Sequence, residues 1–276
     1  MEEMQNQDAP KMSSVEEIQE EQELNHTDKL VGVFAEPQNV FTKIAKFPAK
    51  TIDWILPVLV LIVVIILGQF VMKTNAEIRQ QQKQKGLEQI EKNFEEAVKK
   101  GQMTQAQADE QMATIEERMD STGAFQTIGL IVGTPIAVFI VFFVISGFFL
   151  LVTKFGLKGA GTYKDVMVAY GLPYYIASIQ QIVVVIAALA MSKFLTGLSV
   201  ADFMGSDKTT VAGFILGKLD VFSIWFYVVF GIGLAKMNKS DNVKKYIIAV
   251  LAIWIIVGLI FFYIAKAVPF LAAFAG

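Results

Sequence analysis

The distribution of charge along this chain of 276 residues constrains its fold more than any other feature. Charged residues make up 18% of the sequence and concentrate in residues 1–50 and 73–127. The remainder contains long apolar runs that a water-soluble domain could not bury. The sequence therefore predicts an all-α integral membrane protein with a five-helix transmembrane bundle. The predicted spans are residues 54–72, 128–152, 167–191, 213–235 and 246–265.

The fourth of these spans is the least regular. Counted from Val221 to Ala235, its about 15 residues reach only about 22 Å as a helix, which is less than the hydrocarbon thickness of about 30 Å. Beginning the helix near Gly213 restores the length but places Lys218 and Asp220 in its outer turns, where Lys218 could extend to the headgroups. A segment that dips into the membrane without crossing it is the alternative.

The loops between the spans predict the orientation of the chain. Residues 153–166 and 236–245 together carry seven lysines, whereas the longer loop 192–220 carries three. Because loops rich in Lys and Arg stay on the cytoplasmic side, the N-terminus is expected inside and the C-terminus outside. Residues 1–29 are polar and acidic and are predicted to be a disordered tail. They lack the basic start and apolar run of a cleaved signal peptide, so the first span is expected to act as a signal anchor.

Residues 30–53 have the pattern of an amphipathic helix on a membrane surface. Pro37 suits the first turn of a helix, and apolar residues recur at helical spacing from Val40 to Phe47. Their apolar side is expected to enter the membrane surface or to pack on the protein's own spans, and the two outcomes are compatible. The lysines predicted to face anionic lipid are Lys43, Lys46 and Lys50.

Residues 73–127 are the one sizeable insertion between spans. Two apolar stripes at helical spacing, from Leu87 to Val98 and from Ala108 to Met119, predict an antiparallel helical hairpin over residues 76–122. Such a hairpin could dock a partner protein, pack on itself, or pair with a second copy in a homodimer.

Composition excludes several kinds of chemistry. The chain has no cysteine and one histidine, His26, which lies in the acidic tail. Thiolate nucleophiles, Fe–S clusters and cysteine zinc sites are therefore excluded. Intramembrane proteases of the Ser–His and metal types also need histidines near the bilayer. No enzyme activity, cofactor or metal is expected, and a net charge of −2 gives no reason to expect nucleic acid.

The third span contains the most polar point expected inside the membrane. A glutamine in mid-span must find a hydrogen-bond partner because lipid offers none, and a proline about two turns earlier should kink the helix. The preferred interpretation is a hydrogen bond between helices, and the alternative is a polar cavity for a headgroup or a solute. The residues of this patch are Tyr170, Pro173, Tyr174, Gln180 and Gln181.

Two further patterns concern the borders of the spans. The carboxylates that lie there are expected to cap helices or to pair with neighbouring lysines. Two GxxxG pairs, Gly129–Gly133 and Gly213–Gly217, would allow close helix approach and would suit a homodimer. The border carboxylates are Glu36, Asp53, Asp165 and Asp220.

Three stretches together resemble a known family. Phe34-Ala-Glu-Pro37 precedes the first span, Gly161-Thr-Tyr-Lys-Asp-Val166 leads to Pro173, and Leu219-Asp-Val-Phe-Ser-Ile-Trp225 opens the fourth span. With these stretches in this order, the chain resembles members of the bacterial branch of the Ypt-interacting-protein (Yip) family over residues 30–72 and 125–265. The residues that carry the resemblance are Glu36, Pro37, Gly161, Pro173, Asp220, Phe222, Trp225 and Gly231.

The resemblance implies a membrane domain of five spans with a cytosolic N-terminus and no enzyme activity. Eukaryotic members associate with prenylated Rab-type GTPases. Their Asp-Leu-Tyr-Gly-Pro signature is absent here, where Ala35-Glu36-Pro37 occupies the corresponding region. A GTPase partner therefore does not carry over to this chain.

Together these observations predict a non-enzymatic membrane scaffold in the bacterial inner (cytoplasmic) membrane. Its lysines would contact membrane lipid, and residues 76–122 would offer a surface to a partner protein. The alternative is a transporter of a small solute or a lipid, or a subunit of one, that uses the polar patch of the third span.

Overall fold

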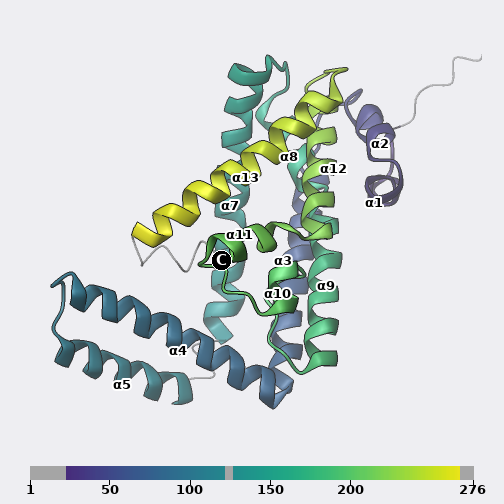
Figure 1. Ribbon diagram of the computed structural model, residues 1–276. Helices are drawn as coiled ribbons and strands as arrows, with labels where there is room; N and C mark the ends of the chain where they lie inside the picture. The colour runs from purple at the N-terminus through teal and green to yellow at the C-terminus, as the bar shows by residue number, and fades with distance from the viewer. Residues whose placement is uncertain (1–22, 122–126, 268–276) are drawn as a thin grey trace, which may run out of the picture.

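The computed structural model describes residues 23–121 and 127–267, and all regular structure within these ranges is helical. Four helical segments are long and apolar enough to cross a membrane, and a bent pair of helices makes a fifth if it is one span. The predicted all-α, multi-span architecture is therefore confirmed (Figure 1). The unbent segments are Ile52–Thr74, Gly129–Leu157, Tyr163–Met191 and Val243–Ile264.

The spans are not all single regular helices. The first is α3 (Ile52–Thr74), and the second joins two π-helical ends to an α-helix: η1 (Gly129–Gly133), α7 (Thr134–Leu151) and η2 (Val152–Leu157). The third consists of α8 (Tyr163–Gly171) and α9 (Tyr174–Met191). The fourth consists of α11 (Val211–Lys218) and α12 (Val221–Met237), and the last is α13 (Val243–Ala267).

Two of these spans are interrupted where the sequence predicted irregularity. Pro173 stands between α8 and α9 as the N-cap of α9, because it has no N–H to donate within a continuing helix. Between α11 and α12 the chain bends by 62° at Leu219–Asp220. The predicted fourth span 213–235 is thus a bent pair of helices in which α12 alone measures about 25 Å.

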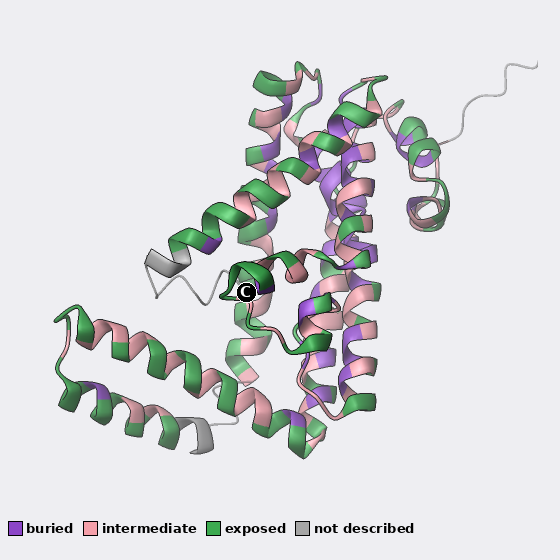
Figure 2. Ribbon diagram, in the orientation of Figure 1, coloured by how far each residue is buried: buried purple, intermediate pink, exposed green. Residues whose placement is uncertain are grey.

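Aromatic side chains fill the centre of the bundle. Trp54 of α3 stacks on Phe142 of α7 with ring centroids 5.2 Å apart, and Phe142 stacks on Tyr170 of α8 at 5.4 Å. The ring of Tyr170 in turn packs against that of Phe230 of α12, with the centroids 4.9 Å apart. Figure 2 shows this core as buried segments where α3, α8, α9 and α12 meet. The large apolar side chains that remain exposed on α3, α7 and α13 form the surface expected to face lipid.

The N-terminal segment departs from the predicted tail. Helix α1 (His26–Ala35) begins within residues 1–29, with Asn25 as an N-cap that accepts from the Asp28 N–H at 2.9 Å. Lys29 is 3% exposed, and its Nζ lies 2.9 Å from both carboxylate oxygens of Asp53. Residues 23–29 are therefore attached to the first span, whereas residues 1–22 lie outside the described part of the chain.

The insertion between the first two spans is a helical hairpin, as predicted. Helices α4 (Ala76–Lys99) and α5 (Gln105–Ser121) pack against each other and project sideways from the bundle (Figure 1). The base of α4 is fixed to the loop after α9, because Gln81 donates to the Ser192 carbonyl at 3.0 Å and accepts from the Phe194 N–H at 2.9 Å. Ile78 is fully buried in the same contact.

Candidate functional site

The first two sequence motifs lie near one end of the bundle, where α1, the start of α8 and the end of α12 converge (Figure 1), and the third motif opens α12 at its other end. The ring of Phe34 lies 5.7 Å from that of Trp225, which joins the first motif to the third. The Gly161 N–H donates to Asn238 Oδ1 at 2.9 Å, which joins the second motif to the turn after α12. A Cβ on Gly161 would lie 2.7 Å from the same oxygen, so this close approach requires glycine.

The amphipathic segment packs on the protein's own spans. Helix α2 (Pro37–Ile44) begins at Pro37 and packs against α12. The Phe41 ring is fully buried and packs directly on Gly233 of α12. A Cβ at Gly233 would lie 2.7 Å from this ring. Of the two outcomes that the sequence left open for the apolar side, packing on a span is the one observed. Glu36, at the N-cap of this helix, accepts from Asn39 at 2.9 Å.

Exposed lysines lie on the polar side of α2, just after it, and in the loops at this end, and those of the loops are the ones that predict the orientation. Lys43, Lys46 and Lys50 are all exposed. Lys50 also contacts Glu23 at 2.6 Å, so part of its charge is balanced within the protein. We call this end, with its exposed lysines, the lysine-rich end. Its other exposed lysines are Lys154, Lys158, Lys164, Lys239, Lys244 and Lys245.

Glu23 is held between two lysines. Hydrogen bonds from Lys50, and then from Lys29, lower the pKa of its carboxyl below the ordinary value. A lowered folded-state pKa means that this contact stabilises the fold above the ordinary carboxyl pKa. The contribution is lost as the pH falls through the lowered value.

The polar patch of the third span forms a contact between helices. Gln180 donates to Asp220 Oδ2 at 2.6 Å, and Asp220 Oδ1 accepts from the Phe222 N–H at 2.9 Å as the N-cap of α12. Asp220 is 5% exposed. The predicted hydrogen bond between helices is therefore confirmed for Gln180. Gln181 points toward Gly68 of α3, where a Cβ would lie 4.0 Å from its amide nitrogen.

The remaining residues of the patch belong to the packed interior. Tyr170 and Tyr174 are buried with ring centroids 5.2 Å apart, and Tyr174 also packs edge-on against Phe142. Three of the four border carboxylates cap or pair as predicted: Asp165 forms a capping box with Thr162 at the start of α8, Asp220 caps α12 and Asp53 pairs with Lys29. Glu36 makes no side-chain cap and accepts from Asn39 instead.

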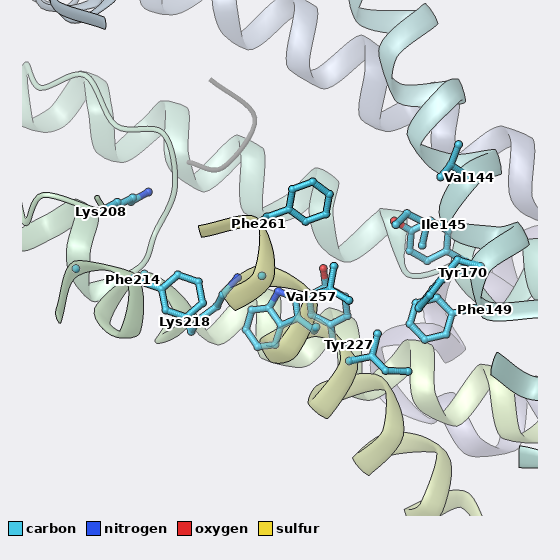
Figure 3. A pocket seen from close by; sticks show the side chains of 16 residues that line it. Val144, Ile145, Phe149, Tyr170, Lys208, Phe214, Lys218, Tyr227, Val257 and Phe261 are labelled. Carbon is cyan, nitrogen blue, oxygen red and sulfur yellow. The ribbon is translucent and has the colours of Figure 1, made fainter. Parts of the chain in front are cut away.

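A separate cavity of about 610 Å³ lies between α7, α11, α12 and α13. Figure 3 shows Lys208, Phe214 and Lys218 at one end and Phe149 and Tyr170 at the other. The Lys218 ammonium lies 4.9 Å from the centroid of Trp254 and 5.1 Å from that of Phe214. The walls are otherwise mostly aliphatic and aromatic.

Comparison with known families agrees with this arrangement. A family model described as the Yip1 domain matches residues 31–265. The chain belongs to the Yip1 domain family. No curated protein and no solved structure matches the chain. The match runs from α1 to α13, so the hairpin lies within the bounds of the Yip1 domain.

The sequence did not predict the cavity of this Yip1-domain protein. The sequence indicates Lys218 only as a cation at a span border, because no residue near it in the chain shows that α13 places Trp254 against it. Within the described ranges, no group of three or more His, Asp or Glu side chains could hold a metal ion.

The two GxxxG pairs of the Yip1 domain do not form seams between its spans. Nothing lies within 4 Å of a Cβ built on Gly129, Gly133 or Gly217. Gly213 instead meets the backbone of the preceding turn at Asp207. The close approaches between spans occur at other glycines, including Gly171 against Trp54 and Gly231 against Ile247.

Proposed function

We propose that this Yip1-domain protein is a non-enzymatic scaffold that gathers anionic lipid at its lysine-rich end, on the cytoplasmic side of a bacterial inner membrane. The observation that carries this proposal is the fixed position of α2. Burial of Phe41 against α12 holds the helix on the bundle, and Lys43 of α2 and Lys46 in the turn after it remain exposed.

Electrostatics makes such a surface effective. Each Lys or Arg close to an anionic membrane surface is worth about 1 kcal/mol, and the effect falls off within a Debye length. The exposed lysines of α2 and of the loops before α8 and α13 lie at the same end of the bundle. Because the helices beneath them are packed, these charges need little ordering when lipid binds.

Replacing Lys43 and Lys46 with glutamine is expected to reduce the enrichment of anionic lipid around the protein several-fold. The full chain is reconstituted in vesicles with a donor fluorophore on Thr42→Cys, which is exposed and is the single cysteine of that variant. Energy transfer is measured to acceptor-labelled phosphatidylglycerol and, separately, to acceptor-labelled phosphatidylcholine.

The matched control replaces Lys92 and Lys99, two exposed lysines of the hairpin, in the same way. It should leave the transfer unchanged. Equal transfer to the two lipids in the parent protein would contradict the proposal.

The hairpin is proposed as the surface for a partner protein. Its base belongs to the bundle through Ile78 and Gln81, so a clean deletion replaces only residues 87–118 with a short Gly/Ser linker. We expect a stoichiometric protein to co-purify from native membranes in mild detergent with the intact chain and to be lost with the deletion. If neither form co-purifies with another protein, the hairpin is excluded as a docking surface. A doubled mass of the intact chain by light scattering would identify a homodimer instead.

A further inference from the structure

The cavity between α7, α11, α12 and α13 is not part of the lysine-rich end. Its volume of about 610 Å³ lies in the range of sites for small molecules. Its two ends differ in polarity. Lys208 and Lys218 lie at one end, and Phe149, Ile145 and Tyr170 lie at the other (Figure 3).

Among the described residues, the polar end holds two lysines, and only Lys208 has a carboxylate partner. Lys208 forms an ion pair with Asp202 at 2.9 Å. Lys218 rests on the rings of Trp254 and Phe214, and no carboxylate of the described residues lies within ion-pair distance of it. Nearby Asp220 is engaged by Gln180 and by the first N–H groups of α12. An ammonium in this setting favours an anionic group with oxygen acceptors.

The depth of the cavity matches that of a lipid. The 17 residues of α12 place the break at Leu219–Asp220 about 25 Å from the lysine-rich end. Lys218 therefore lies in the half of the bilayer opposite the lysine-rich end, since the hydrocarbon core is about 30 Å thick. Tyr170 is seven residues into the third span, which begins at Tyr163 at the lysine-rich end. The apolar end of the cavity therefore points back into the hydrocarbon.

The cavity is also open to the side that faces lipid. Its wall residues Val144, Phe148 and Phe261 are 63%, 40% and 48% exposed. Val144 and Phe148 belong to α7 and Phe261 to α13, two helices whose outer faces are expected to contact acyl chains. A lipid can therefore enter from the membrane without crossing a polar barrier.

We propose that this cavity binds one anionic phospholipid from the leaflet opposite the lysine-rich end. The phosphate contacts the Lys218 ammonium, and an acyl chain lies between α7 and α13. The site is independent of the exposed lysines Lys43 and Lys46 on and beside α2, which we call the α2 surface. The two lie at opposite ends of α12 and share no residue.

Photo-crosslinking of the full chain in nanodiscs tests this assignment. Two probes carry the same diazirine acyl chain, one on phosphatidylglycerol and one on phosphatidylcholine, and the labelled peptides are mapped by mass spectrometry. We expect the phosphatidylglycerol probe to label peptides of α7 and α13 about fivefold more than the phosphatidylcholine probe. Lys218→Gln should remove this preference, and Lys218→Arg should keep it.

A steric variant tests occupancy separately from charge. A Cβ on Gly217 meets nothing within 4 Å, and the residue lines the cavity, so the side chain of Gly217→Leu starts in open space and is expected to occupy part of the cavity. It should lower labelling of α7 and α13 by both probes. Replacement of Lys43 and Lys46 should leave this labelling unchanged, which separates the result from that of the α2 surface.

Three outcomes would overturn the proposal. If the two probes label α7 and α13 equally, and Lys218→Gln does not change this labelling, lipid fills the cavity without headgroup recognition. Labelling of neither helix by either probe means that another occupant, such as a second copy, covers the cavity. Unchanged labelling of α7 and α13 in Gly217→Leu means that the labelled lipid lies on the outer surface of these helices.

Discussion

Replacing Asp53 with alanine is expected to destabilise the protein by about 3 kcal/mol, because it leaves the Lys29 ammonium buried without its main partner. Lys29 is 3% exposed and Asp53 is 1% exposed, and Lys29 Nζ lies 2.9 Å from both oxygens of Asp53. Glu23, at 3.3 Å from the same nitrogen, limits the loss. The measurement is the thermal unfolding of the purified chain in detergent, followed by far-UV circular dichroism.

The same variant should release the N-terminal segment before the bundle unfolds. Limited proteolysis is expected to cut near α1 in Asp53→Ala and to spare it in the parent protein. Lys50→Gln is the matched control, because it removes the ion pair of an exposed lysine with Glu23 and should cost less than about 1 kcal/mol. Equal stability of Asp53→Ala and the parent would show that α1 is not held by this ion pair.

Replacing Gly231 with alanine is expected to destabilise the protein by about 3 kcal/mol, through overpacking between α12 and α13. A Cβ at this position would lie 2.7 Å from the Cα of Ile247. Because that neighbour is backbone, relief requires the two helices to move apart. The same unfolding measurement in detergent reports the change.

Gly147→Ala is the control for Gly231→Ala, since it makes the same chemical change in another span. Nothing lies within 4 Å of a Cβ on Gly147. This control should be neutral or slightly stabilising, because alanine favours a helix more than glycine does. A similar loss in both variants would indicate that helix packing at Gly231 is not the cause.

Local sequence signals predicted the outline of this protein well. The four unbent spans, the hairpin and the break at Pro173 follow from hydropathy, periodicity and the missing N–H of proline. Capping by Asp165 and Asp220 also follows from a carboxylate placed just before an apolar run. Each of these features depends on residues within a few turns of one another.

The long-range partners could not be predicted in the same way. Lys29 is one charged residue among many in a polar segment, and nothing near it in the sequence points to Asp53, which lies 24 positions later. Gln180 clearly needed a partner, but its choice of Asp220 depends on how α9 packs beside α12. The apolar side of α2 fits a membrane surface and a span equally well by pattern, and only the contact of Phe41 at Gly233 shows that it packs on a span.

The sequence alone determined that this chain is a helical membrane protein, because the need to satisfy every backbone hydrogen bond in lipid leaves an apolar run little choice but a helix. Its Yip type follows from the resemblance of its motifs and from the family match. The tertiary structure decided where polar groups inside the protein find partners and where a cavity is left. These outcomes depend on the bend between α11 and α12 and on the placement of Trp254 over Lys218. Burial and electrostatic pairing are properties of distances in space, and helices far apart in the chain set those distances only when they pack.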